Sequence, residues 1–300
     1  MFGKRTVRDL DVTTGQAVLA RVDFNVPLEG GRVTDDARIR AALPTIELLL
    51  EKGVRLVLCS HLGRPQGRDP ETSLAPVSAR LAELIDAEVY QAPEVVGPEV
   101  RRGVDRQEPG TVLVLENTRW ERGETENDPA LARELASLAD AYVNDAFGAA
   151  HRAHASTAGV AEYLRPAVAG LLLEDEVETL RSIVESPERP LVVVLGGAKV
   201  TDKIALIDRF LDTADALLIG GAMCFSFFRA QGIATGDSLV EEEGVELAKR
   251  AFEKADSSEC RLILPTDLVA GDRFDAGAEH RELDGVEVPD GWMGLDIGPR

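Results

Sequence analysis

The feature that most constrains the fold of this chain is the regular alternation of short apolar runs with amphipathic helical segments. Apolar runs typical of strands occupy residues 17–22, 54–59, 111–115, 141–144, 191–195, 216–219 and 261–264. Helical periodicity fills intervals between them, at residues 36–52, 76–85, 129–138, 203–211 and 241–254. Strands that alternate with helices form parallel sheets with helices on both faces. The pattern therefore predicts an α/β protein built from doubly wound parallel sheets.

The chain is predicted to contain two such domains, because its 300 residues exceed the usual size of one. Residues 174–185 have apolar side chains at helical spacing, and SPERP ends this helix before the next strand. We therefore expect a first domain at 1–170, a joining helix or hinge at 171–188 and a second domain at 189–300. In the second domain, the uninterrupted apolar strand LVVVL is predicted to be buried on both faces of its sheet.

Charge and cysteine content limit the classes of partner and compartment. The chain has 33 basic and 53 acidic residues, a formal net charge of −20 at pH 7. Such a protein repels nucleic acid and anionic membranes, and no apolar run is long enough to span a bilayer, so neither partner is expected. Three cysteines form an odd set without metal-ligand spacing, which favours a reducing cytoplasm over secretion.

Lysine supplies only six of the 33 basic residues, and arginine supplies the others. Little lysine with an excess of Asp and Glu keeps a surface hydrated where salt screens charge repulsion. Two interpretations follow: a halophilic protein of a high-salt cytoplasm, or an ordinary acidic protein from a GC-rich genome.

Polar side chains follow four predicted strands in the first half, at the strand ends where open parallel sheets bind ligands. In chain order these side chains are Asp23, Asn25, His61, Arg64, Arg119, His151, Arg152 and His154, with Arg38 in the first turn of a following helix. Asp23 and Asn25 are candidates to hydrogen-bond a ligand hydroxyl, or simply to form a turn. His61 is a candidate phosphate donor or a structural histidine.

The four arginines of this set predict an anion site. Converging guanidinium groups repel one another unless an anion lies among them, and their planar shape matches phosphate or carboxylate. One exposed arginine is more typical of a surface ion pair, but four on equivalent loops favour a small, multiply charged anion. No metal site is predicted, because His151 and His154 have no third ligand nearby.

The second half carries two strand–Gly–Gly segments, with the glycine pairs at 196–197 and 220–221. Glycine lets the backbone approach a phosphate closely, and helix N-terminal amides attract anions, although the segment is not a Walker A loop. Lys199 and Lys203 lie four residues apart, on one face of any helix that contains both. In a chain with so little lysine, this pair favours a chemical role for the two side chains over the alternative that they only lie at the solvated start of a helix.

Together these segments resemble the phosphoglycerate kinase family. The matching segments, in family order, are RVDFNVP, SHLGRP, LENTRW, DAFGAAHRAHAST, VVVLGGAKVTDKI, LLIGGAMCFSFF, LPTDLVAG and WMGLDIGP. The resemblance implies two Rossmann-like domains joined by a helix, in a cytoplasmic monomer. It implies reversible transfer of a phosphoryl group from 1,3-bisphosphoglycerate to Mg-ADP, which gives 3-phosphoglycerate and Mg-ATP.

The resemblance also implies a role for each site residue. Those that would bind the triose are Asp23, Phe24, Asn25, Arg38, His61, Leu62, Gly63, Arg64, Arg119 and Arg152. Those near the nucleotide are Gly197, Lys199, Lys203, Gly220, Gly221 and Gly294. Arg38 and Lys199 are predicted to act on the transferring group from opposite domains. In-line transfer needs positioning and charge stabilisation, with domain closure about the joining helix to expel water.

One departure from the family pattern bears on activity. Family members continue beyond the final DIGPR, into a segment with a ribose-contacting glutamate and a Mg²⁺-binding aspartate. The resemblance therefore implies an incomplete nucleotide-binding domain, with no metal ligand in this chain. Two alternatives stay open: a phosphoglycerate kinase, or a non-catalytic fragment that binds only triose phosphate. A different α/β sugar or acyl-phosphate kinase would require all these motifs to be coincidental.

Overall fold

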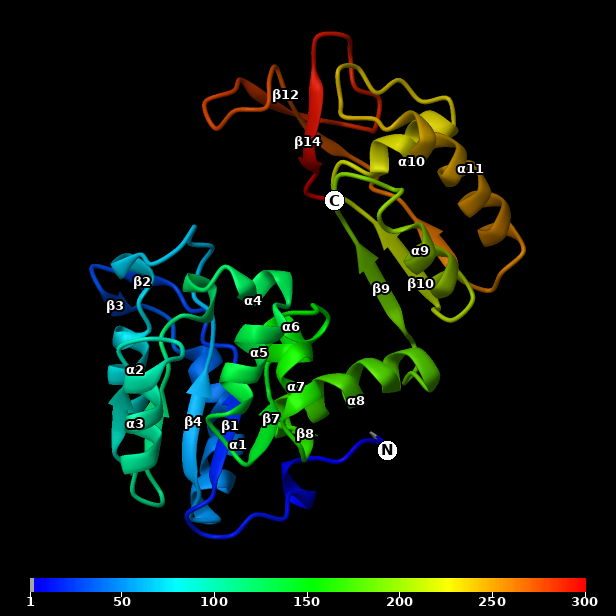
Figure 1. Cartoon of the computed structure of the whole chain (residues 1–300). Coiled ribbons are helices and arrows are strands. Elements are labelled where there is room, and N and C mark those ends of the chain that lie inside the picture. Colours follow the sequence, from blue (N-terminus) through cyan, green and yellow to red (C-terminus); the bar gives the residue numbers. More distant parts are fainter. Residues whose placement is uncertain (1–2) are drawn as a thin grey trace. The chain divides into compact units, whose positions relative to one another are not determined.

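The structure, a computed structural model, describes residues 3–300 and is shown in Figure 1. The chain forms two compact units, Met1–Arg181 and Ser182–Arg300. Helix α8 (Leu171–Glu185) contains the boundary between them. None of the helices within residues 3–300 is long and apolar enough to cross a membrane.

The first unit is built on a six-stranded parallel sheet in the order β5-β6-β4-β1-β7-β8. Its strands are β1 (Ala17–Arg21), β4 (Arg55–Cys59), β5 (Val89–Gln91), β6 (Val112–Val114), β7 (Ala141–Asn144) and β8 (Ala167–Ala169). On one side of β1 the chain adds β4, then the edge strand β5, and then β6 between them. On the other side it adds β7 and then β8. The predicted doubly wound parallel arrangement is confirmed for this unit.

Helices fill the connections, and a short hairpin precedes the first of them. The helices are α1 (Ala37–Glu51), α2 (Ala75–Ala82), α3 (Pro98–Arg106), α4 (Gly123–Glu126), α5 (Pro129–Ala136), α6 (Phe147–Ala150) and α7 (Val160–Tyr163). The hairpin pairs β2 (Leu28–Glu29) with β3 (Arg32–Val33). Short helical segments of other types are η1 (Val7–Asp9), η2 (Pro70–Thr72), η3 (Thr118–Trp120) and η4 (Ala155–Gly159).

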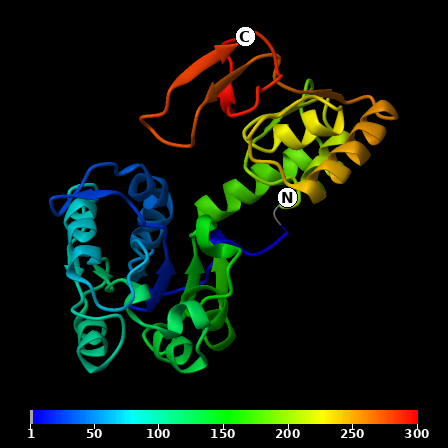
Figure 2. The ribbon, with the colours of Figure 1, turned by 90° about the horizontal axis from the view of Figure 1, so that it is seen from above.

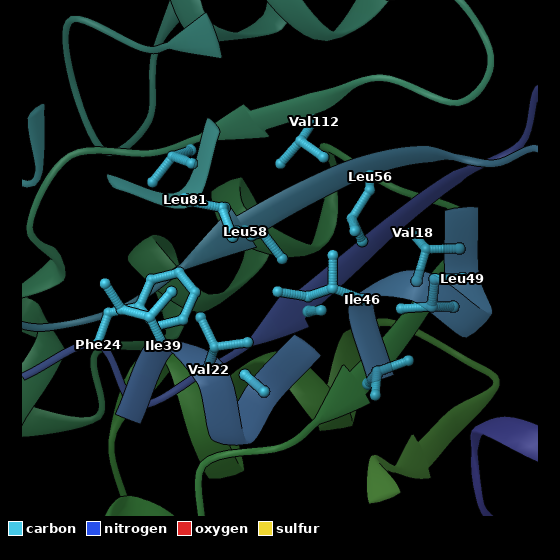
Figure 3. Close-up of a cluster of buried hydrophobic side chains, with 14 of the residues drawn as sticks. Val18, Val22, Phe24, Ile39, Ile46, Leu49, Leu56, Leu58, Leu81 and Val112 are labelled. Atoms are coloured by element: carbon cyan, nitrogen blue, oxygen red, sulfur yellow. The ribbon is translucent and has the colours of Figure 1, made fainter. Parts of the chain in front are cut away.

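Hydrophobic clusters cover both faces of this sheet. Val18 and Ala20 of β1 belong to the cluster that α1 and α2 cover, which Figure 3 shows in close-up. Ala17 and Leu19 point into the other cluster, which α3 and α5 cover. Because side chains of a strand alternate between faces, a strand covered on both sides must be apolar throughout. This burial explains the uninterrupted apolar sequence of β1, apart from the arginine at its end.

The second unit begins with a three-stranded parallel sheet in the order β11-β10-β9. Its strands are β9 (Val192–Leu195), β10 (Ala216–Ile219) and β11 (Arg261–Ile263), and its helices are α9 (Ile204–Leu211), α10 (Cys224–Ala230) and α11 (Glu242–Asp256). Apolar residues of these helices share one cluster with Leu217 and Ile219 of β10. The strands and helices follow the predicted alternation within one to two residues at their ends.

The predicted burial of LVVVL on both faces is wrong for the residues that the structure describes. Val193 and Leu195 pack against the helices, whereas Val192 and Val194 are 52% and 70% exposed. Figure 1 shows α9, α10 and α11 on one side of this sheet. An apolar run predicts a strand, but the elements that cover each face are decided elsewhere in the chain.

An antiparallel sheet completes the second unit, and the sequence patterns did not predict it. It has the order β13-β12-β14, with β12 (Leu268–Gly271), β13 (His280–Leu283) and β14 (Met293–Ile297). Figure 2 shows this sheet in orange to red, and Leu268 and Ala270 of β12 belong to the same hydrophobic cluster as the helices. Its strands are four or five residues long, and β13 is largely exposed, so they lack the apolar runs that indicated the other strands.

Candidate active site

Four adjacent strands in the centre of the first sheet deliver the predicted anion-binding residues to one edge. These strands are β6, β4, β1 and β7, which run parallel, so their carboxyl ends lie together. The loops that leave those ends surround a cavity of about 270 Å³. Its lining residues are Asp23, Asn25, Arg38, His61, Gly63, Arg64, Arg119, Gly148 and Arg152. The structure thus brings all four predicted arginines into the wall of one cavity.

Hydrogen bonds between the loops hold this wall in place. Arg38 and Asp23 form an ion pair, with 2.8 Å between Nη1 and Oδ2. The Gly63 amide donates to Oδ1 of Asn25 at 2.8 Å, and Nη1 of Arg119 donates to the Gly63 carbonyl at 2.6 Å. The loop after β4 is therefore tied to the loops after both β1 and β6. These ties orient the polar groups around the cavity before any ligand binds.

The cavity is electropositive, since its wall has four guanidinium groups and one carboxylate. Burial and the neighbouring charges of Arg152 and Arg21 lower the pKa of Arg119. Nε of Arg119 is buried without a hydrogen-bond partner among residues 3–300. A buried guanidinium N–H beside other cations is unfavourable unless an anion accepts from it. The geometry therefore suits a small, multiply charged anion.

His61 lines the same cavity as a neutral side chain. It is 6% exposed, and its Nδ1 lies 2.9 Å from Nη2 of Arg21. Burial, and then the positive charge of Arg21, lowers the pKa of His61 to about 2. The imidazole is therefore a neutral hydrogen-bonding group at ordinary pH, not a further cation.

Phe24 and Leu62 do not line the cavity, although the resemblance implied that they bind the triose. Both side chains belong to the hydrophobic core, where Figure 3 shows Phe24 next to Ile39 of α1. The Phe24 amide donates to Ser60, and Asn117 binds both the amide and the carbonyl of Leu62. These apolar residues anchor their loops, and their polar neighbours face the cavity.

In the second unit, the loops after β9 and β10 meet at their glycines. Gly221 has a φ of +65°, and a Cβ there would lie 2.8 Å from the nitrogen of Gly197. The Gly197 carbonyl accepts from the Met223 amide at 2.8 Å. The close backbone approach at this position is thus between the two loops themselves. At Gly220 a Cβ would meet no atom closer than 4.0 Å, so packing does not require that glycine.

The two lysines flank this junction from a loop, not from one helix. Lys203 lies immediately before α9, and its Nζ would lie 3.1 Å from a Cβ on Gly197. Lys199 is exposed in the turn that precedes it. No helix contains both lysines, because α9 begins only after Lys203. Their common feature is the β9–α9 loop.

Gly294 lies on β14, where packing explains its lack of a side chain. A Cβ there would lie 2.0 Å from Cζ of Phe225, deep inside contact distance. Its amide donates to Oγ of Ser238 at 2.9 Å. These contacts account for the glycine without a nucleotide.

Within residues 3–300, no group of three or more His, Cys, Asp or Glu side chains is placed to hold a metal ion. His154 instead has its Nδ1 3.7 Å from a carboxylate oxygen of Glu124. The three cysteines are buried as free thiols.

Four residues at or behind the cavity were not among the predicted site residues. Gly148 lines it, and a Cβ there would lie 2.7 Å from Oδ2 of Asp23. Arg21, Glu124 and Ser156 form a buried polar layer next to His61. Arg21 carried a usable signal, because an arginine inside an otherwise apolar strand is rarely buried without a purpose. The other three carried none, since their roles depend on contacts distant in sequence.

Comparisons with known proteins agree with this geometry. A family model described as phosphoglycerate kinase matches residues 7–300. The phosphoglycerate kinase of Rubrobacter xylanophilus is 55% identical over 298 residues, which cover 99% of this chain and 74% of the relative. The cytosolic phosphoglycerate kinase of Triticum aestivum is 51% identical over 302 residues, covering 100% of this chain and 75% of the relative.

A solved structure is similar over the same extent. The structure of phosphoglycerate kinase from Coxiella burnetii has a TM-score of 0.78 and 39% sequence identity, and the match covers 99% of this chain and 75% of that one. The chain thus spans about three quarters of the length of these relatives.

Proposed function

Because this chain belongs to the phosphoglycerate kinase family and is therefore a glycolytic phosphotransferase, we propose a role for each of its two units. The reaction transfers a phosphoryl group reversibly between 1,3-bisphosphoglycerate and ADP, giving 3-phosphoglycerate and ATP. In the proposal, the triose phosphate binds at the arginine-lined cavity of the first unit. The nucleotide binds at the glycine pairs and lysines of the second.

The observation that carries the triose assignment is the convergence of Arg64, Arg119 and Arg152 on one cavity of about 270 Å³. Fixed guanidinium groups bind a phosphate with several charge-assisted hydrogen bonds. The unpartnered Nε of Arg119 adds a buried donor that needs an acceptor. On a chain of charge −20, such a local cluster selects a small anion over a large acidic surface.

Arg38 and Lys199 are the residues we assign to the transferring group. Phosphoryl transfer requires positioning and stabilisation of the negative charge spread over the equatorial oxygens. Arg38 is 54% exposed at its side chain, and its ion pair with Asp23 holds it at the cavity wall. Asp23 and Asn25 are proposed to hydrogen-bond a hydroxyl of the triose, since both line the cavity. No covalent intermediate on the protein is needed.

We assign Lys199, Lys203 and the glycines at 197, 220 and 221 to the nucleotide phosphates. Two observations support this assignment. The β9–α9 and β10–α10 loops meet there, and the side chain of Lys203 extends over Gly197. Gly294 stays in the proposal on the resemblance alone. Mg²⁺ is proposed to arrive with the nucleotide, and we derive no step through a protein-bound metal.

The proposal includes the domain organisation expected from the sequence. The triose-binding domain is residues 1–170, the hinge is 171–188 and the nucleotide-binding domain is 189–300. Transfer between ligands held on different domains requires hinge closure, which also excludes water. We further propose a cytoplasmic monomer, and the cytosolic location of the wheat relative supports this compartment.

Calorimetric titration of 3-phosphoglycerate into this chain in molar KCl tests the triose assignment. We expect saturable binding that Arg64→Ala weakens by at least about tenfold, because a charge-assisted contact is lost. Arg68→Ala is the matched control. This arginine follows in the same loop but pairs with Glu94 and does not line the cavity. A folded chain that binds no 3-phosphoglycerate, or equal losses in both variants, would contradict the assignment.

A further inference from the structure

A series of buried polar side chains, linked by hydrogen bonds, lies directly behind the cavity and ends at His61. Nε of Arg21 donates to Oγ of Ser156 at 2.8 Å, and Nη2 of the same guanidinium contacts Nδ1 of His61 at 2.9 Å. Ser156 in turn donates its hydroxyl to Oε1 of Glu124 at 2.6 Å. Glu124, Ser156 and Arg21, here called the relay, come from α4, η4 and β1, which are far apart in sequence.

Each nitrogen and carboxylate oxygen of the relay side chains has a hydrogen-bond partner, and the relay has a single orientation. Glu124 and Arg21 are each 0% exposed, and Ser156 is also buried. The second carboxylate oxygen of Glu124 accepts from the Ser156 amide at 2.9 Å, and Thr118 donates to the first. The remaining guanidinium nitrogen of Arg21 donates to the Val22 carbonyl. A guanidinium can only donate, so the direction of every hydrogen bond in the relay is determined.

This direction determines which nitrogen of His61 carries the proton. Nδ1 must accept from Arg21, so a neutral imidazole has its hydrogen on Nε2. Protonation of Nδ1 would break that hydrogen bond and place a second cation beside Arg21. The other groups that act on the imidazole are Arg119, Arg152 and His154, and each opposes a positive charge there.

The free nitrogen is the one available to a ligand. His61 lines the cavity, Nδ1 is occupied in the buried layer behind it, and Nε2 has no hydrogen-bond partner among the described residues. A phosphate or carboxylate oxygen can only accept, so it requires a nitrogen that carries hydrogen. The opposite tautomer would present a lone pair to the anion and repel it.

We propose that Glu124, Ser156 and Arg21 are positioning residues that hold His61 in its neutral Nε2–H tautomer, as a fixed donor to the triose ligand. The inference rests on the proposed function of the cavity and adds how its one imidazole is kept ready to bind. Burial, and then the positive charge of Arg21, keeps the pKa of His61 low, so ligand binding does not require protonation of the histidine.

Nitrogen-15 NMR of the intact chain, labelled at its four histidines, tests the tautomer without any ligand. His61→Gln identifies the His61 resonances by their disappearance. We expect the Nε2–H tautomer, with no change between about pH 5.5 and 8. An Nδ1–H tautomer, or titration within that range, would overturn the proposal.

Ser156→Ala tests the relay itself, because it removes the link between Glu124 and Arg21. We expect a mixture of His61 tautomers and a two- to tenfold weaker affinity for 3-phosphoglycerate, roughly in proportion to the loss of the competent tautomer. Tyr142→Phe is the matched control. Its hydroxyl donates to the Ser156 carbonyl at 2.8 Å, so this variant loses an equally buried hydrogen bond outside the relay. The control should keep the tautomer and the affinity.

If Ser156→Ala does not fold, Arg21→Lys repeats the test, because one ammonium group cannot reproduce the two-sided contact of a guanidinium. Unchanged His61 resonances in a folded relay variant would refute the positioning role. Failure of the positioning role and failure of the proposed function give different results. If the tautomer is as expected but the wild-type chain binds no 3-phosphoglycerate, the proposed function fails, and the donor role fails with it.

Discussion

Arg38 is the residue whose loss should separate catalysis from binding. Its guanidinium is held by Asp23 at the cavity wall and is half-exposed, so it can follow charge that develops on a transferring group. We expect Arg38→Ala to lower kcat by about a hundredfold or more, while the dissociation constant of 3-phosphoglycerate rises by less than about tenfold. Steady-state kinetics and calorimetry on the same preparation provide both numbers.

The Arg68→Ala variant again provides the control, because its partner Glu94 lies outside the cavity. Equal losses of turnover and affinity in Arg38→Ala would show that Arg38 binds the ground state and transition state alike. In that case the transition-state role would have to be given up.

At the residue scale, candidate side chains that follow strand ends were predictable, and those that depend on contacts distant in sequence were not. Arg64 and Arg152 follow strands whose ends could be located from the sequence, and strand ends of parallel sheets meet at one edge. Glu124 and Ser156 are 32 residues apart, and nothing local indicates that they bond to each other. Their pairing exists only after the chain folds.

At the element scale, the start of helix α8 depends on one buried carboxylate. Oδ1 of Asp145 accepts from the amides of Leu172 and Leu173 at 2.9 and 3.2 Å, and Oδ2 is buried without a partner among the described residues. Burial raises the pKa of Asp145 from 3.8 to about 6. The folded state therefore binds this proton more tightly than the unfolded state does.

This raised pKa predicts the sign of a pH dependence. Because the pKa of Asp145 is raised in the folded state, its contribution to the free energy of unfolding is complete below about pH 4 and is lost as the pH rises through about 6. The loss amounts to about 3 kcal/mol. Asp145→Asn cannot ionise, so its unfolding free energy should lack this loss across the same range. Urea denaturation at several pH values, followed by Trp120 in a Trp292→Phe background, measures it in the first unit. Parallel pH profiles for the two proteins would contradict the assignment.

The elements of the first unit were easier to predict than those of the second. In the first unit, apolar strands and amphipathic helices each carry their own periodic signal, because both faces of the sheet are covered. In the second, β13 has three exposed residues of four, and β9 is open on one face. A strand without a covered face lacks the hydrophobic pattern by which strands are predicted. An apolar run predicts a strand but does not indicate which of its faces is covered.

At the scale of the whole molecule, the net charge of −20 and the positive cavity respond to salt in opposite ways. Screening reduces repulsion among surface carboxylates, so a halophilic protein gains stability as KCl rises from about 0.1 to 2 M. The same screening weakens attraction between the arginines and a triose phosphate, so affinity should fall. Thermal melts and titrations across one KCl series test both effects.

Full stability in dilute buffer would rule out the halophilic interpretation and leave an ordinary acidic protein. Loss of structure on dialysis into dilute buffer would support it. The affinity measurement has its own control. Arg64→Ala removes one positive charge from the cavity, so the affinity of this variant for the triose phosphate should depend less steeply on the salt concentration.

The sequence alone determined the parallel α/β class, the strand ends of the first unit and the arginines that gather there, because periodicity and strand-end position are local properties. It also determined the family, through motifs that run across most of the chain. Only the tertiary structure decided that Phe24 and Leu62 are core residues, that β9 has an exposed face, and that Arg21 reaches His61. Burial and hydrogen-bond partners depend on which distant segments pack together, and no local pattern contains that information.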